Sequence, residues 1–214
     1  MKIKYINVSC FLITSDKGTR LITDPFFHLY IPDDPPPGGN PIRPGIEENA
    51  DVISISHGHF DHSYIYAIKG VPRLYTGGTS IEIKGIRFSS TVTWHDNYGE
   101  GGRGLNNVTC FEVDGIRISH MGDYGQPELT DEQTAQIGRT DILMTPWGNW
   151  APRLIEQLKP RVVLPMHHTR TEQVRDLKGF MDLTDKTSEL EYTKMTIPSE
   201  MQVIMLGASL ESSM

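Results

Sequence analysis

The most reactive group of side chains in the sequence lies between residues 57 and 62. His57, His59, Asp61 and His62 place three imidazoles and one carboxylate within six positions. On an extended segment the first two histidines project to the same side, while the aspartate and the last histidine follow after the chain has begun to turn. The four groups can therefore serve two neighbouring metal ions, and Gly58 leaves the backbone room to bend. The alternative is a histidine-rich surface loop that binds nothing, but such loops seldom follow a strand of core residues.

The elements around this motif place it on a strand-to-helix turn. Residues 51–56 before it contain Val52, Ile53 and Ile55, a pattern typical of a short buried strand. Residues 63–69 after it, closed by Gly70, predict a short helix. The metal-competent side chains are therefore expected at the end of a sheet strand.

The rest of the chain changes pattern near Thr130. Before it, short apolar runs separated by turn residues predict β meanders; after it, helical and strand patterns alternate, which together indicate the α/β layered class. The proline- and glycine-rich residues 32–44 predict a loop that can act as a flap over the site. The predicted strands are 3–6, 9–14, 19–23, 51–56, 73–76, 81–83, 86–92, 108–113, 116–119, 141–144, 162–164 and 203–206, and the predicted helices are 63–69, 130–137, 152–158 and 172–180.

The composition indicates one mildly acidic domain spanning residues 1–214. Twenty Lys and Arg against 27 Asp and Glu give a net charge of −7, and a 37% hydrophobic content excludes a disordered chain and a membrane bundle. Residues 1–14 lack the unbroken apolar run of a signal peptide, and no apolar run is long enough to span a bilayer, so we expect a cytoplasmic protein. Cys10 and Cys110, both in strand-like contexts, are expected to be buried and reduced.

At residues 57–62 the sequence resembles the metallo-β-lactamase superfamily, whose first metal-binding motif is His-x-His-x-Asp-His at the end of a strand. Further matches follow in the family's order at Asp24 in Thr-Asp-Pro, His95 in Trp-His-Asp, Asp123 in His-Met-Gly-Asp and His167 in Leu-Pro-Met-His. The resemblance covers about residues 5 to 170 and implies a four-layer αββα sandwich with a two-metal site at one edge of the sheets. The Gly-Gly-Arg-Gly-Leu-Asn-Asn run after His95 is most similar to the ascorbate-6-phosphate lactonase-like branch.

The resemblance also implies a ligand set. The first metal would be held by His57, His59 and His95, the second by Asp61, His62 and His167, with Asp123 bridging both. The sequence alone also allows a purely structural role for two of these residues. Asp123 precedes Tyr124-Gly125 and can instead cap a turn, and His95 can be a satisfied loop histidine.

Three further residues are expected to support or compete with these ligands. His167 and His168 are adjacent after a strand and point apart, so one of them reaches the metal, and the family pattern favours His167. His120 ends an alternating strand and is expected in the core or behind the ligands. Asp24 is expected to orient the histidine loop, with a simple turn aspartate before Pro25 as the alternative.

Two polar residues are candidates for substrate binding. Arg103 lies in the glycine-rich segment 99–104, where it can pair with a phosphate or carboxylate, or remain a solvated arginine. Asn149 lies between two tryptophans.

The acidic balance of the chain disfavours a long nucleic acid as partner, so the expected partner is a small molecule, which can be anionic. A membrane partner is not expected, and a homo-oligomer is allowed.

The reaction implied is hydrolysis of a small ester, lactone, amide or phosphoester by a hydroxide bridging two divalent metal ions, with Asp61 and Asp123 orienting the water. The nitrogen-rich ligand set favours zinc, and manganese or iron would also fit. No serine-nucleophile, phosphate-loop or dinucleotide motif is present in the sequence. The rival functions are a metal-binding sensor without turnover, an iron-dependent redox enzyme and a nucleic-acid-processing enzyme, although the length leaves no room for the attached redox or substrate-gripping domain expected of the last two.

Overall fold

Short strands of β-branched and aromatic residues build the first of two sheets. The computed structural model describes residues 1–26, 46–167 and 179–208. The strands β1 (Lys2–Asn7), β2 (Cys10–Thr14) and β3 (Arg20–Thr23) form an antiparallel meander, which β4 (Val52–Ser54) and β5 (Arg73–Tyr75) extend in parallel. On the other side, β13 (Glu189–Glu191) pairs with β1, giving the order β13-β1-β2-β3-β4-β5.

The second sheet has eight strands and joins a meander to a parallel half. The meander consists of β6 (Ile81–Ile83), β7 (Ile86–Trp94), β8 (Leu105–Val113) and β9 (Ile116–His120). The parallel half adds β10 (Ile142–Pro146), β11 (Val162–Met166), β14 (Gln202–Leu206) and β12 (Phe180–Leu183). Parallel strands end at one edge of a sheet, so residues after β9, β10 and β11 are brought together there.

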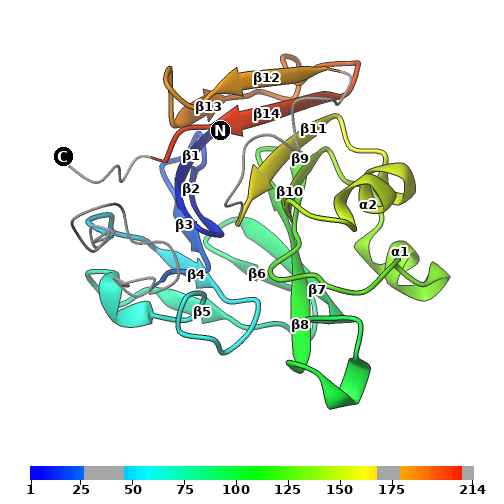
Figure 1. Ribbon diagram of the computed structural model, residues 1–214. Helices are drawn as coiled ribbons and strands as arrows, with labels where there is room; N and C mark the ends of the chain where they lie inside the picture. The colour runs from blue at the N-terminus through cyan, green and yellow to red at the C-terminus, as the bar shows by residue number, and fades with distance from the viewer. Residues whose placement is uncertain (27–45, 168–178, 209–214) are drawn as a thin grey trace, which may run out of the picture.

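Two helices cover the outer face of the eight-stranded sheet (Figure 1). The helix α1 (Asp131–Ile137) begins at a capping box, with Thr130 Oγ1 accepting the Gln133 N–H and Gln133 Oε1 accepting the Thr130 N–H. The helix α2 (Ala151–Leu158) has Pro152 in its first turn, where proline costs no hydrogen bond. Among the described helices, none is long and apolar enough to cross a membrane.

Apolar side chains fill three layers of packing. Between the sheets lie large rings such as Phe11, Phe88 and Phe111. Outside the eight-stranded sheet, Leu154 and its neighbours on α1 and α2 pack on the strands. A third cluster, which includes Ile22, covers the outer face of the six-stranded sheet. Two sheets face to face with outer covering layers confirm the predicted αββα sandwich.

Residues 63–69, predicted as a helix, form only the 3₁₀ turn η1 (Ile65–Ala67), so this prediction is wrong in type and length. Tyr64 at the start of η1 provides no side-chain cap, and Ser63 Oγ donates its hydrogen bond backward to the His59 carbonyl. The Tyr64 N–H donates to the Pro25 carbonyl at 2.7 Å. The first residues of the segment are thus bound to the preceding loops rather than to a helical turn.

The strands β12 and β13 were not predicted from the sequence. Both lie at sheet edges and have only four and three residues, so neither is long enough to show a clear apolar alternation. Phe180, predicted as the end of a helix over 172–180, instead begins β12. Residues 172–178 of that helix and the proline-rich loop 32–44 lie outside the described residues.

Both cysteines are buried and free, as the sequence predicted. Cys10 is 0% and Cys110 is 2% exposed, and burial raises the pKa of each thiol. Because the thiolate is the reactive form, we expect neither thiol of the native protein to react with Ellman's reagent within minutes, while both react in denaturant. Rapid reaction of either thiol in the native protein would contradict this burial.

Candidate metal centre

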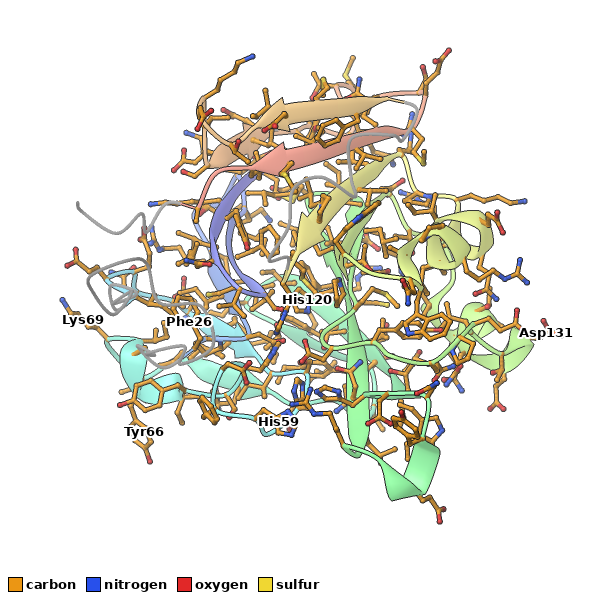
Figure 2. All side chains as sticks on the ribbon, viewed as in Figure 1. Phe26, His59, Tyr66, Lys69, His120 and Asp131 are labelled. Atoms are coloured by element: carbon orange, nitrogen blue, oxygen red, sulfur yellow. The ribbon has the colours of Figure 1, made fainter. Side chains whose placement is uncertain are left out.

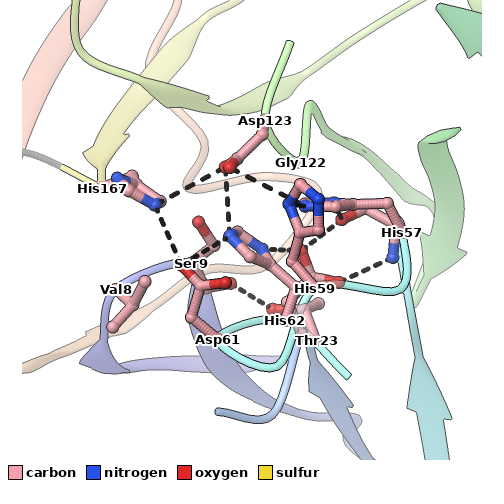
Figure 3. A network of polar contacts seen from close by, with 12 residues as sticks. Val8, Ser9, Thr23, His57, His59, Asp61, His62, Gly122, Asp123 and His167 are labelled. Carbon is pink, nitrogen blue, oxygen red and sulfur yellow. Dashed lines mark hydrogen bonds and ion pairs between the residues drawn. The ribbon is translucent and has the colours of Figure 1, made fainter. Parts of the chain in front are cut away.

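The candidate site forms where strands from both sheets end at one edge (Figure 2). Residues 57–62 follow β4 of the six-stranded sheet. His95 follows β7, the turn to Asp123 follows β9, and His167 follows β11, all from the eight-stranded sheet. Segments far apart in the sequence therefore supply one cluster of imidazoles and carboxylates, which Figure 3 shows from close by.

The first group of side chains contains three histidines. His57 Nε2 lies 3.0 Å from His59 Nδ1, and the ring of His95 lies 4.8 Å from that of His57 and 4.9 Å from that of His59. One nitrogen of each ring lies within 4.8 Å of the other two. Three ring nitrogens converging on one point form a geometry that can hold a metal ion.

The second group contains a carboxylate and two histidines. Asp61 Oδ2 lies 3.7 Å from His62 Nε2 and 3.8 Å from His167 Nε2. The two imidazole rings stack with centroids 5.4 Å apart and planes within 8°. His62 is fully buried, whereas the side chains of Asp61 and His167 are 33% and 37% exposed, so the second group opens to solvent on their side.

The carboxylate of Asp123 lies between the two groups (Figure 3). Its Oδ2 is 3.1 Å from His95 Nε2 and 3.8 Å from His57 Nε2. Its Oδ1 is 3.2 Å from His62 Nε2 and 3.7 Å from His167 Nε2. Each oxygen thus faces a different group, whereas a residue serving only as a turn cap would direct its carboxylate to backbone N–H groups.

Asp24 is buried behind His62 and fixes its ring. Asp24 Oδ2 accepts hydrogen bonds from His62 Nδ1 at 2.8 Å and Ser56 Oγ at 2.6 Å, and Oδ1 accepts one from the Ser56 N–H at 2.8 Å. Because the carboxylate accepts a hydrogen bond from Nδ1, Nε2 of the same ring is directed at the site. The same arrangement is found behind histidines that ligate metal ions. Ser56, which the sequence analysis did not single out, also contacts His57 Nδ1 at 2.9 Å.

The electrostatics of the cluster separate the two central histidines. Burial and the neighbouring His62 lower the pKa of His57 to about 4, so its ring is neutral at pH 7. Burial also opposes protonation of His62, but the carboxylates of Asp123 and Asp24 outweigh it and raise its pKa to about 10.

The two carboxylates of the cluster are ionised. Burial alone would raise the pKa of Asp61, but His167 and His62 lower it to about 2. The pKa of Asp123 is likewise far below its usual range, because burial is outweighed by His62 and His95.

Several buried polar atoms at the centre of the cluster make no hydrogen bond of good geometry, although His62 Nε2 and Asp123 Oδ1 lie 3.2 Å apart. They are His62 Nε2, both ring nitrogens of His95 and Asp123 Oδ1. Buried polar atoms are normally paired, so such a concentration at one point needs a physical cause. A divalent cation bound at this point would explain these unpaired atoms, because imidazole nitrogens and carboxylate oxygens are ligands of such ions. The cation would also supply the positive charge among the carboxylates that a protonated His62 otherwise provides.

The turn that carries Asp123 is held from behind by two buried residues. His120 Nδ1 accepts a hydrogen bond from the Gly122 N–H at 3.3 Å, and Asn106 Oδ1 accepts one from the Asp123 N–H at 3.0 Å. Gly122 has φ +56°, and a Cβ there would lie 2.2 Å from Asn106 Oδ1, so only glycine fits. His120 was expected in the core or behind the ligands, whereas no role was predicted for Asn106, whose only signal in the sequence was its place in the Leu-Asn-Asn run.

The two candidate substrate-binding residues differ in position. Arg103 is exposed, and its N–H donates to Asp96 Oδ2 at 2.7 Å. Burial, then His95 and then the charge of Arg103 lower the pKa of His59. Asn149 is exposed before α2, and the hydrogen bonds of the described residues include none between it and the cluster. His168, the rival of His167, lies outside the described residues.

Comparison with known proteins agrees with this fold. The model of the β-lactamase superfamily domain family matches residues 2–167. A UPF0173 metal-dependent hydrolase of Thermococcus kodakarensis is 26% identical over 229 residues, covering 89% of this chain and 95% of that protein. One of Thermococcus onnurineus is 26% identical over 205 residues, covering 78% of this chain and 84% of that protein.

A solved structure from Thermotoga maritima, of a metallo-β-lactamase superfamily protein, superposes with a TM-score of 0.73 at 25% identity and covers 96% of this chain and 98% of that one. The matched family region contains every residue of the cluster from Asp24 to His167. The chain therefore belongs to the β-lactamase superfamily domain family, as a metal-dependent hydrolase of the metallo-β-lactamase superfamily.

Proposed function

We propose that the chain hydrolyses a small molecule at a centre for two divalent metal ions. The observation that carries this proposal is the position of Asp123, whose Oδ2 faces His57 and His95 while its Oδ1 faces His62 and His167. A carboxylate with each oxygen directed to a separate group of imidazoles is suited to bridging two neighbouring ions.

The ligand assignment follows the two groups. The first ion would be held by His57, His59 and His95, the second by Asp61, His62 and His167, with Asp123 shared. Bound divalent ions lower the pKa of a water molecule and stabilise negative charge on a substrate oxygen. The nitrogen-rich set favours zinc over magnesium or calcium, and iron and manganese are also compatible.

The chain's own groups would orient the reactants. Asp61 is a carboxylate at neutral pH, because its pKa is lowered to about 2, and one-third of its side chain faces solvent. Its Oδ2 faces His62 and His167, so its other oxygen, Oδ1, can accept a hydrogen bond from an attacking water molecule and orient it. Asp24 keeps Nε2 of His62 directed inward throughout, since it holds the opposite nitrogen of the ring.

The substrate class that we propose is a small ester, lactone, amide or phosphoester, since cleavage of each passes through negative charge on an oxygen. A screen of lactones, thioesters and phosphodiesters with zinc-loaded protein tests this proposal. We expect metal-dependent turnover that places one ¹⁸O atom from labelled water in the product without consuming O₂. Consumption of O₂, or turnover that survives complete removal of the metals, would contradict it.

Arg103 provides a prediction about substrate charge. Its charge contributes to the lowered pKa of His59, a residue of the first group, and a guanidinium can pair with a phosphate or carboxylate of the substrate. We expect Arg103→Ala to raise KM for anionic substrates by an amount equivalent to about 1 to 3 kcal/mol and to leave KM for neutral substrates nearly unchanged. Arg87→Ala is the control, because this exposed arginine lies near the start of β7, at the end of the strand opposite to His95. Equal changes for both substrate classes would make the role of Arg103 structural.

A further inference from the structure

The two-residue connection between β1 and β2 has a backbone conformation that its sequence does not favour. Val8 has φ +55°, a region that β-branched residues rarely occupy and that glycine or asparagine normally provides in tight hairpins. Val8 is 7% and Ser9 is 0% exposed, so this hairpin tip is buried rather than displayed at the surface. Such a conformation persists only where the surroundings fix it, and it is often found at functional sites.

The carbonyl groups of the hairpin tip accept hydrogen bonds from segments that carry proposed metal ligands. Val8 O accepts the His167 N–H at 2.8 Å. Ser9 O accepts His120 Nε2–H at 2.8 Å, and the other nitrogen of that ring accepts the N–H of Gly122, next to Asp123. Both bonds cross from the six-stranded sheet to the eight-stranded sheet.

Ser9 O also accepts a hydrogen bond within its own sheet. The donor is Thr23 Oγ1 at 3.0 Å, in the residue directly before Asp24. Thr23 Oγ1 in turn accepts the Phe11 N–H at 3.0 Å, which fixes the hydroxyl between the two neighbouring strands. Two adjacent carbonyl groups therefore contact the beginnings of three loops, and Figure 3 shows Val8, Ser9 and Thr23 beside the residues of the cluster.

We propose that the Val8–Ser9 hairpin tip is a positioning element of the metal centre, which holds the loops of Asp24, Asp123 and His167 in mutual register. This inference rests on the proposed function, because it assigns the tip to the same two-metal site. The positive φ at Val8 is part of the arrangement, since a negative φ at this residue would change the path of the chain through the tip and with it the positions of the Val8 and Ser9 carbonyl groups. None of the tip's side chains needs to contact an ion.

Zinc affinity of variants, measured by competition with a chromophoric chelator well below the unfolding temperature, tests the proposal. Thr23→Val removes the donor to Ser9 O without changing side-chain shape, and we expect it to raise the zinc dissociation constant of the weaker site by about 10- to 100-fold. Thr23→Ser retains the hydroxyl and should restore binding. Thr140→Val is the matched control, because it removes a buried hydroxyl near the opposite edge of the eight-stranded sheet, before β10.

A second pair of variants tests the conformation of Val8. Val8→Pro fixes φ near −65° and should weaken zinc binding, while Val8→Gly tolerates the positive φ and should retain it. In metal-free protein, the His167 N–H should exchange with solvent faster in Val8→Pro than in the wild type. If Thr23→Val binds zinc as the wild type does, the hairpin tip has no positioning role, even if Val8→Pro fails to fold. Absence of zinc binding by the wild type would instead contradict the proposed function, and the amide exchange would still test the tip.

Discussion

Asp123→Ala is expected to abolish binding of both metal ions and to reduce turnover by at least about 10²- to 10⁴-fold. The reason is that this carboxylate faces both groups, with its oxygens 3.1 Å from His95 Nε2 and 3.2 Å from His62 Nε2. Its removal leaves two sets of imidazoles without the charge between them. Metal analysis after dialysis, together with initial rates on the best substrate of the screen, measures both effects.

The matched control for Asp123 is Asp131→Ala. Asp131 is exposed at the start of α1, on the outer side of the molecule (Figure 2), and its loss should change neither metal content nor turnover. Retention of one full equivalent of metal by Asp123→Ala would show that the carboxylate belongs to one ion only. In that case the bridging assignment would be wrong, although a single-metal hydrolase would remain.

Asp24→Ala is expected to lower both stability and metal affinity, because this side chain accepts three hydrogen bonds while 1% exposed. Breaking a buried charged pair by removing one partner costs about 3 to 5 kcal/mol, which urea unfolding of the metal-free protein would measure. The same change releases His62 Nδ1, so the zinc dissociation constant should rise by about 10- to 100-fold.

Asp24→Asn separates charge from conformation. Asp24 has φ +37°, a region that asparagine also tolerates, so this variant keeps the turn but loses the carboxylate. It should recover part of the stability lost in Asp24→Ala while keeping the reduced metal affinity. Wild-type metal affinity in both variants would show that Asp24 only supports the fold.

The residues closest in sequence were also the easiest to predict from it. His57, His59, Asp61 and His62 lie within six positions, and their spacing after a buried strand was sufficient to propose a metal site. His95, Asp123 and His167 are brought to them only by the sheet topology, since β7, β9 and β11 end at the same edge. Their assignment therefore needed the family resemblance rather than spacing alone.

The supporting contacts of the site could not be predicted, for physical reasons. The carbonyl groups of Val8 and Ser9 are backbone atoms, which every residue type has, so no side-chain pattern indicates their roles. Asn106 is one of two adjacent asparagines, and only the strand geometry shows that its amide oxygen reaches the Asp123 N–H. The strands β12 and β13 were missed because they have only four and three residues, too few to show the periodicity on which strand prediction depends.

The most direct test of the two-metal centre is the metal content of the wild-type protein. The protein would be purified, stripped with chelator, reconstituted with excess zinc and freed of unbound ions before elemental analysis. Because the two groups of side chains share Asp123, we expect about two zinc ions per chain, each lost in parallel with turnover on renewed chelation. A content of one ion or none in folded protein would contradict the two-metal centre.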